Sequence, residues 1–273
     1  PRPGQAPNDR EELLQRVDRA LRESVRRQLV SDVPLGAFLS GGIDSSLMVR
    51  YMAEEGGHPV ETFSLAFDEA GFDESQEALA VSEAFGTRHH RLEAPAIGGE
   101  VFAEAVSKLA QPLADPAYVM TESLSRLTRE HVTVAISGDG GDELFGGYAR
   151  YAITEDAFPD SYWKRVLRSG VDRGILPGSL SRRALFGAEM LHYQRVEVGN
   201  WRGRKQLSRY LDAGIADEAH ADRTLHTWTD LVAELGGRMD SSTLMRADLW
   251  TYLSENCLTK TDRASMAHGL EVR

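Results

Sequence analysis

The chain has 273 residues, of which 41% are hydrophobic and 27% are charged, and its formal net charge is −11. This length suffices for one substantial domain or two small ones. The acidic residues are dispersed and no run of about 18 apolar residues occurs, which argues against nucleic-acid binding and against a membrane span. The single cysteine, Cys257, excludes an internal disulfide and a Cys-X-X-Cys metal site, and it fits a reducing cytoplasm.

Helical and strand patterns alternate along the first half of the chain. Asn8 and Glu11 form a capping box for a helix with an apolar side from Leu13 to Leu29, and Pro34 prevents that helix from continuing. The patterns that follow predict strands at 35–39, 60–67, 87–92 and 132–136, and helices at 45–55, 74–85, 99–110 and 118–131.

Strands separated by helices favour an α/β fold, with a parallel twisted sheet flanked by helices on both faces. Ligands of such sheets lie beyond the carboxyl ends of the strands. Past residue 151 the strand signals fade and the pattern becomes helical. We therefore predict an α/β core over residues 1–150 and a helical lobe over residues 151–273.

The run Ser40–Ser46 follows the first strand and opens the next helix, and it reads Ser-Gly-Gly-Ile-Asp-Ser-Ser. Unpaired N–H groups and the helix dipole favour an anion such as phosphate there, the glycines allow close approach of the backbone, and the serines add hydroxyl donors. Asp44 would repel a phosphate unless a cation lay between them, so we interpret Asp44 as a Mg²⁺ ligand. An ordinary Gly-rich turn is the alternative, and the kinase-type P-loop pattern G-x-x-x-x-G-K-[ST] is absent.

A second Gly-rich segment, Ser137–Tyr148, follows the apolar strand predicted at 132–136. It holds three acids within five residues, Asp139, Asp142 and Glu143. Crowded carboxylates repel one another and usually persist because a cation binds them. A solvated acidic turn is the alternative interpretation, although such turns seldom follow directly on a buried strand.

These segments resemble the motifs of a known family. The first run resembles the pyrophosphate-binding loop (PP-loop) SGG-x-DSS of the N-type ATP pyrophosphatases. The second resembles the SG-[DE]-G-x-DE-x-x-GGY motif of the asparagine synthetases, and Leu258–Arg273 resembles their L-x-K-x-DR-x-SMA-x-x-x-E-x-R stretch. Because the three segments occur in the family's order, the chain is similar to the C-terminal synthetase domain of the glutamine-hydrolysing asparagine synthetases.

The resemblance implies a sheet of the adenine nucleotide alpha hydrolase type (HUP-type), with ATP and Mg²⁺ as cofactors. It implies a ligase in which a carboxylate, most simply aspartate, attacks the α phosphate of ATP and releases pyrophosphate. Ammonia then displaces AMP from the acyl-adenylate and gives an amide. The ammonia would come from a glutaminase domain or a partner, and the resemblance also allows a homodimer.

The resemblance further assigns site residues by position. It places Phe38 and Leu65 at the adenine site and lets Asp44 and Asp142 hold Mg²⁺. It also implies a nucleotide-binding set drawn from the two Gly-rich segments: Ser40, Gly41, Gly42, Ile43, Asp44, Ser45, Ser46, Ser137 and Gly138. Core packing is the alternative for Phe38 and Leu65.

Two further residues are catalytic candidates by resemblance. Asp139 matches an acidic position beside the reacting carboxylate, where it could accept protons from attacking ammonia. Lys260 belongs to the third motif. A loop-shaping role is the alternative for Asp139, and support of the site from a buried helix is the alternative for Lys260.

The chain departs from the family in two places. The N-terminal glutaminase domain is missing, and the chain stops at Arg273, where the family continues with a P-F-L-D stretch and a lysine that stabilises pyrophosphate; we therefore expect a truncated C-terminal end. The alternative function is a related amidotransferase or cyclase, of the β-lactam synthetase or lasso-peptide cyclase type, acting on another natural product or a sugar. The β-lactam type has a tyrosine where Asp139 stands, which favours ammonia-dependent amidation. A non-catalytic nucleotide-binding scaffold is the third possibility.

Overall fold

The structure of the protein is a computed structural model, and it describes residues 9–56, 58–67, 73–96, 98–109, 113, 115–148, 151, 234 and 241–273. Contacts divide the chain into two compact units. Pro1–Asp139 and Ser254–Arg273 form the first unit, and Gly140–Leu253 forms the second. Most of the helical lobe predicted for residues 151–273 lies outside the described residues, so the boundary at residue 150 stays a prediction.

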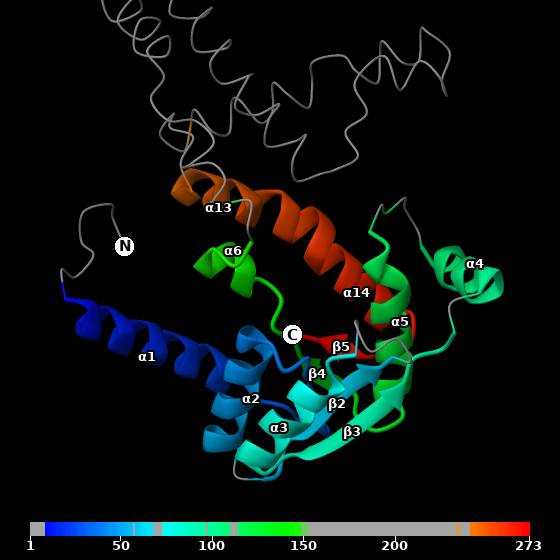
Figure 1. The fold of residues 1–273 in the computed structure, drawn as a ribbon, viewed down its shortest axis with the longest axis horizontal. Coiled ribbons are helices and arrows are strands. Elements are labelled where there is room, and N and C mark those ends of the chain that lie inside the picture. Colours follow the sequence, from blue (N-terminus) through cyan, green and yellow to red (C-terminus); the bar gives the residue numbers. More distant parts are fainter. Residues whose placement is uncertain are drawn as a thin grey trace, which may run out of the picture. The chain divides into compact units, whose positions relative to one another are not determined.

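A parallel sheet forms the centre of the first unit (Figure 1). Its strands are β1 (Leu35–Phe38), β2 (Glu61–Ala66), β3 (Arg88–Glu93), β4 (Val134–Ile136) and β5 (Glu271–Val272). They lie in the order β3-β2-β1-β4-β5, and every neighbouring pair is parallel. The predicted α/β fold with a parallel sheet is confirmed.

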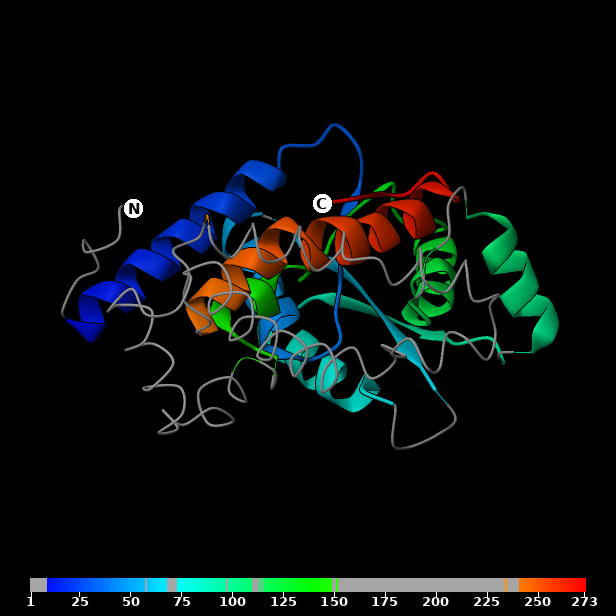
Figure 2. The same ribbon diagram turned by 90° about the horizontal axis from the view of Figure 1, so that it is seen from above.

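Helices cover both faces of this sheet (Figures 1 and 2). The helices of the first unit are α1 (Arg10–Gln28), α2 (Ile43–Glu55), α3 (Ser75–Phe85), α4 (Gly99–Ser107), α5 (Ala117–Thr128) and α14 (Thr259–Met266), the last preceded by the π-helix η1 (Leu253–Leu258). The chain steps outward from β1 to β3 and then returns past β1 to β4. Because parallel crossovers are right-handed, α2 and α3 cover one face, and α5 and α14 cover the other, where they pack side by side.

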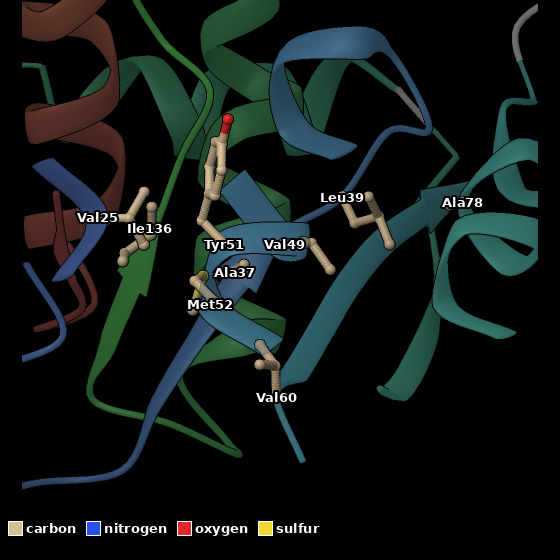
Figure 3. Close-up of a cluster of buried hydrophobic side chains, with 9 residues drawn as sticks. All are labelled: Val25, Ala37, Leu39, Val49, Tyr51, Met52, Val60, Ala78 and Ile136. Atoms are coloured by element: carbon tan, nitrogen blue, oxygen red, sulfur yellow. The ribbon is translucent and has the colours of Figure 1, made fainter. Parts of the chain in front are cut away.

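The core consists of apolar side chains that alternate between the two faces. Ala37 of β1 packs toward α2, and Phe38 packs the opposite way toward Phe63 and Ala135. Figure 3 shows the cluster on the α2 side, which contains Val25, Ala37, Leu39, Val49, Tyr51, Met52, Val60, Ala78 and Ile136. This packing fixes the carboxyl ends of β1 and β4 beside the start of α2.

Two details at the ends of the first unit differ from the sequence predictions. The capping box at Asn8 is wrong, because the N-cap of α1 is Asp9, whose carboxylate accepts a hydrogen bond from the Glu11 N–H at 3.1 Å. Both residue types cap helices well, so the sequence left this choice open. Strand β5 was not expected, since its two residues lie in a polar segment.

In the second unit, the described elements are α6 (Gly141–Phe145) and α13 (Ser241–Trp250), which pack against each other. The Tyr151 hydroxyl donates a hydrogen bond of 2.7 Å to Asp248 Oδ2, and the Ser241 hydroxyl donates one of 3.0 Å to the Tyr151 carbonyl. In the described part of the chain, no helix combines the length and the apolar character needed to cross a membrane.

Candidate active site

A cavity of about 360 Å³ lies in the first unit at the carboxyl ends of β1, β2 and β4. This volume is in the range of small-molecule sites. Its apolar lining is Phe38, Leu39, Phe63, Leu65, Phe67 and Leu124. Its polar lining is Ser40, Asp44, Ser45, Ser64, Glu74, Thr121, Ser137, Gly138, Asp139, Lys260 and Thr261. An apolar part beside a part rich in hydroxyls and charges suits a ligand with an aromatic ring and an anionic tail.

The loop Ser40–Ser46 is held together by its own serines. The Ser40 and Ser45 hydroxyl oxygens are 3.1 Å apart, and the Ser45 hydroxyl donates to the Gly42 carbonyl at 3.2 Å. Gly42 is the N-cap of α2 and has no side chain with which to cap the helix. Because Asp44 and Ser45 of the first turn line the cavity, the positive end of α2 faces this space.

Two glycines bring the loops together. Gly41 has φ +84°, and a Cβ atom there would overlap the Glu77 Cβ and lie 2.8 Å from the Ala78 nitrogen, so a side chain would push the loop away from α3. At Gly138, a Cβ atom would lie 3.0 Å from the Ser45 nitrogen. The loop after β4 therefore packs directly on the first turn of α2.

The segment that begins α14 completes the cavity wall. The Thr261 hydroxyl donates a hydrogen bond of 2.7 Å to Asp139 Oδ2. Lys260 lines the cavity, and its Nζ lies 3.4 Å from Asp115 Oδ2. Parts of the three segments that the sequence singled out thus meet at one cavity of the first unit: Ser40–Ser45, Ser137–Asp139 and Lys260–Thr261. More than 200 residues separate Ser40 from Lys260.

The structure places most of the predicted site residues at this cavity. Those that line it are Phe38, Ser40, Asp44, Ser45, Leu65, Ser137, Gly138, Asp139 and Lys260. The predicted residues of the first unit that do not line it are Gly41, Gly42, Ile43 and Ser46. Ile43 is 79% exposed, and the Ser46 hydroxyl is buried with no hydrogen-bond partner among the described residues. Side-chain contact of these residues with a nucleotide stays a prediction.

Asp142 belongs to the second unit, at the start of α6. Its backbone carbonyl accepts hydrogen bonds from the Gly146 and Gly147 N–H groups at 2.8 and 3.0 Å. A Cβ atom at Gly147 would overlap the Asp142 carboxylate, and the buried Glu143 accepts a hydrogen bond of 2.8 Å from the Tyr148 hydroxyl. The described residues contain no group of three or more His, Cys, Asp or Glu side chains placed to hold a metal ion, and a magnesium site shared by Asp44 and Asp142 stays a prediction.

Sequence reasoning missed Glu74 and Thr121, which line the cavity, and Asp115, which contacts Lys260. Asp115 precedes Pro116 and α5, and its Oδ1 accepts a hydrogen bond of 2.9 Å from the Ala117 N–H. An Asp-Pro pair before a helical pattern is a typical start signal, and this signal could have indicated a capping aspartate there. Nothing in the local sequence points to its contact with Lys260.

A histidine supports the cavity wall from β3. His89 lies between two hydroxyls of β2, with Nε2 3.1 Å from Ser64 Oγ and Nδ1 3.1 Å from Thr62 Oγ1. Burial lowers the pKa of His89, and the neighbouring His90 lowers it further. His90 stacks on Phe63 with ring centroids 4.9 Å apart, so these adjacent histidines face opposite sides of the sheet.

A Gly- and Ser-rich loop that opens a helix at the carboxyl edge of a parallel sheet defines the class of nucleotide-binding α/β domains. The asparagine synthase family model matches residues 16–273, and the chain belongs to this family. Over 94% of its length it is 32% identical to a putative glutamine-hydrolysing asparagine synthetase of Mycobacterium bovis, of which it covers 39%.

Further relatives extend this picture. Asparagine synthetase 1 of Bacillus subtilis, which is glutamine-hydrolysing, is 30% identical over 97% of the chain and 42% of its own length. The amidase chyE of Penicillium rubens is 31% identical over 65% of the chain and 29% of its own length. The chain thus spans 39% and 42% of the length of the two asparagine synthetases.

Proposed function

We propose that this domain is an ATP-dependent amide-forming ligase that adenylates a carboxylate and transfers ammonia to it. The observation that carries the proposal is the meeting of three segments at one cavity: the loop at Ser40, the loop at Ser137–Asp139, and the start of α14 at Lys260. The relatives that share most of the chain carry the names of asparagine synthetases. AMP and pyrophosphate would be the products from ATP.

The nucleotide would occupy the cavity with its two ends in different surroundings. Its triphosphate would lie against the N-terminus of α2, where backbone N–H groups and the Ser40 hydroxyl would donate hydrogen bonds. Its adenine would lie against the apolar side chains of Phe38 and Leu65. Lys260 supplies a positive charge that stabilises the charge developing on the phosphates.

Asp44 is the residue of this cavity that fits a magnesium ion, because it places a carboxylate beside the helix end proposed to bind phosphate. Bound Mg²⁺ would neutralise the pyrophosphate leaving group and polarise the α phosphate. That Asp142 is a second ligand remains a prediction from the sequence.

The chemical steps conserve atoms and charge as follows. A carboxylate oxygen of the substrate bonds to the α phosphorus, and the bond to pyrophosphate breaks. Ammonia then attacks the acyl carbon, and the bond to AMP breaks. Asp139 could accept the proton that ammonia loses, because Thr261 orients the Asp139 carboxylate through Oδ2, and none of the described residues donates a hydrogen bond to Oδ1.

Aspartate is the acyl substrate that we propose, with asparagine as product, on the basis of the names of the relatives. The ammonia would come from a glutaminase domain or a partner, and a cytoplasmic location and a homodimer stay predictions. The relationship to an amidase with a different name favours a second candidate, in which the same chemistry serves another acyl substrate, as in enzymes of the β-lactam synthetase or lasso-peptide cyclase type.

The test is to incubate the protein with ATP, Mg²⁺, ammonium and a panel of carboxylic acids, and to measure AMP. AMP release that requires aspartate would support asparagine synthesis. AMP release with another acid alone would support the second candidate. Tight ATP binding with no AMP formed from any acid would indicate a nucleotide-binding scaffold and contradict the proposed ligase.

A further inference from the structure

Asp115 stands at the junction between α5 and α14. Its Oδ1 accepts a hydrogen bond of 2.9 Å from the Ala117 N–H at the start of α5. Its Oδ2 accepts one of 2.9 Å from the Asn256 side-chain amide and lies 3.4 Å from Lys260 Nζ. Both carboxylate oxygens are therefore fixed by neutral donors, and the contact with Lys260 is an additional one.

Lys260 keeps most of its hydrogen-bonding capacity. Its side chain is 16% exposed and lines the cavity, and among the described residues Asp115 is the one carboxylate within 4.0 Å of its ammonium group. An ammonium group has three donors, so it can bind an anion in the cavity while it keeps its contact with Asp115.

The cavity also contains carboxylates that could capture a mobile lysine. Asp44, Asp139 and Glu74 line the same space. A lysine side chain has many rotamers, and a lysine without an anchor could pair with one of these acids, where it would neutralise a group that the ligand needs. An anchor at the wall keeps the positive charge apart from them.

We propose that Asp115 is a positioning residue that holds Lys260 at the cavity wall, ready to bind the phosphate oxygens of the nucleotide. The inference rests on the proposed function, because it assumes that ATP occupies this cavity. Asp115 itself touches no reacting atom; it acts through Lys260. Asn256 assists by holding the carboxylate of Asp115 in place.

The test is a double-mutant cycle with Asp115→Asn, Lys260→Gln and the double variant. Asparagine at position 115 retains an acceptor for the Ala117 N–H but cannot form an ion pair with Lys260. We expect Asp115→Asn to weaken Mg²⁺-ATP binding about tenfold, which is within the range of interaction energies between residues in contact. In the Lys260→Gln background, Asp115→Asn should not weaken binding further. Titration calorimetry with Mg²⁺-ATP gives the four dissociation constants.

Asp9→Asn is the matched control, because Asp9 Oδ1 likewise accepts from the N–H two residues on, at the start of α1. It should leave ATP binding unchanged. If Asp115→Asn does not fold, Asp115→Ser keeps a capping oxygen without charge and replaces it in the cycle.

The outcomes separate the inference from the proposed function. Wild-type protein that binds no ATP would overturn the proposed function and the inference with it. Two results would overturn the inference alone, provided that the wild-type protein binds ATP. In the first, Asp115→Asn does not weaken ATP binding. In the second, Asp115→Asn weakens ATP binding as much in the Lys260→Gln background as in the wild type.

Discussion

Two lysines of the first unit make contrasting contacts. Lys108, at the end of α4, lies 2.6 Å from Glu122 Oε1 and 3.2 Å from Glu104 Oε1, and the hydrogen bond with Glu122 raises its pKa. Lys260, at the start of α14, lies 3.4 Å from Asp115. Lys108 and its two glutamates form a cluster of charged side chains that pair with one another, which we call the Lys108 cluster, whereas Lys260 lines a cavity.

The Lys108 cluster also contains His268, whose Nε2 lies 2.6 Å from the same Glu122 oxygen. It joins α4, α5 and the end of α14, and the Glu122 side chain is only 6% exposed. A buried charged group whose hydrogen-bonding partners are all side chains of the protein stabilises the packing of the helices that carry them. A charged group that borders a cavity and has unused hydrogen-bond donors can bind a ligand. The comparison predicts that mutations at the cavity will affect ligand chemistry, whereas mutations in the cluster will affect stability.

The largest expected effect is at the cavity. Asp44→Asn removes the carboxylate proposed to hold Mg²⁺ and should lower the rate of AMP formation by about a thousandfold, the upper end of the loss from one electrostatic contact in an active site. Thermal unfolding should stay close to that of the wild type. Asp18→Asn, at an α1 residue that accepts a hydrogen bond from the Tyr51 hydroxyl, is the control and should leave the rate intact. An active Asp44→Asn variant would contradict the assignment.

In the Lys108 cluster we expect a mutation to lower stability and to leave the reaction rate unchanged. Glu122→Gln leaves Lys108 and His268 without their shared buried carboxylate, and it should lower the free energy of unfolding by about 3 kcal/mol. The rate per folded molecule should not change. Urea unfolding measures the loss, and Glu104→Gln, whose side chain is 72% exposed, should show almost none. An equal loss of unfolding free energy in Glu122→Gln and Glu104→Gln would contradict a stabilising role of the buried Glu122 carboxylate.

Gly41 and Gly86 both have positive φ, and a comparison of their alanine variants distinguishes the cost of backbone strain from the cost of a close contact. Gly41→Ala should cost about 2 kcal/mol of stability, because the backbone conformation and the overlap with Glu77 both oppose a side chain, and ATP binding should weaken with it. Gly86 has φ +64°, but no atom of the described residues would lie within 4 Å of a Cβ added there, so Gly86→Ala should cost about 1 kcal/mol and leave ATP binding unchanged. Calorimetry and urea unfolding of both variants give the comparison, and an equal effect on ATP binding would contradict it.

The smallest expected effect is a pH dependence of stability. Burial by itself would raise the pKa of Glu122, but hydrogen bonds from Lys108 and His268 outweigh it, and the pKa lies below its ordinary value of 4.5. The unfolded state therefore binds the proton more readily, so this stabilisation is present above about pH 4.5 and is lost as the pH falls further. Wild-type protein should lose stability more steeply than Glu122→Gln below that pH in urea titrations. Parallel slopes would show that Glu122 does not titrate in this way.

Much of the fold could be predicted from the sequence because its signals are local. Apolar runs gave strands such as β1 and β4, and Gly86, with φ +64°, ends α3 where predicted. Strand β5 was missed, since two residues in a polar stretch have no periodicity and pair only because β4 is beside them.

The same distinction between local signals and tertiary contacts applies to the residues of the site. The glycines, serines and acids of the loops mark a site by their chemistry, and their meeting follows from the parallel sheet. Contacts made by single side chains across the fold, such as Thr261 with Asp139 and Lys260 with Asp115, have no signature in either partner's sequence neighbourhood.

The central claim is that the cavity at the carboxyl ends of β1, β2 and β4 binds ATP. A crystal structure with Mg²⁺ and an ATP analogue carrying a methylene bridge between the α and β phosphates tests it most directly. We predict phosphate oxygens at the N–H groups that begin α2, adenine between Phe38 and Leu65, and Lys260 within hydrogen-bonding distance of a phosphate. An analogue bound elsewhere on the protein, with this cavity holding only solvent, would contradict the account.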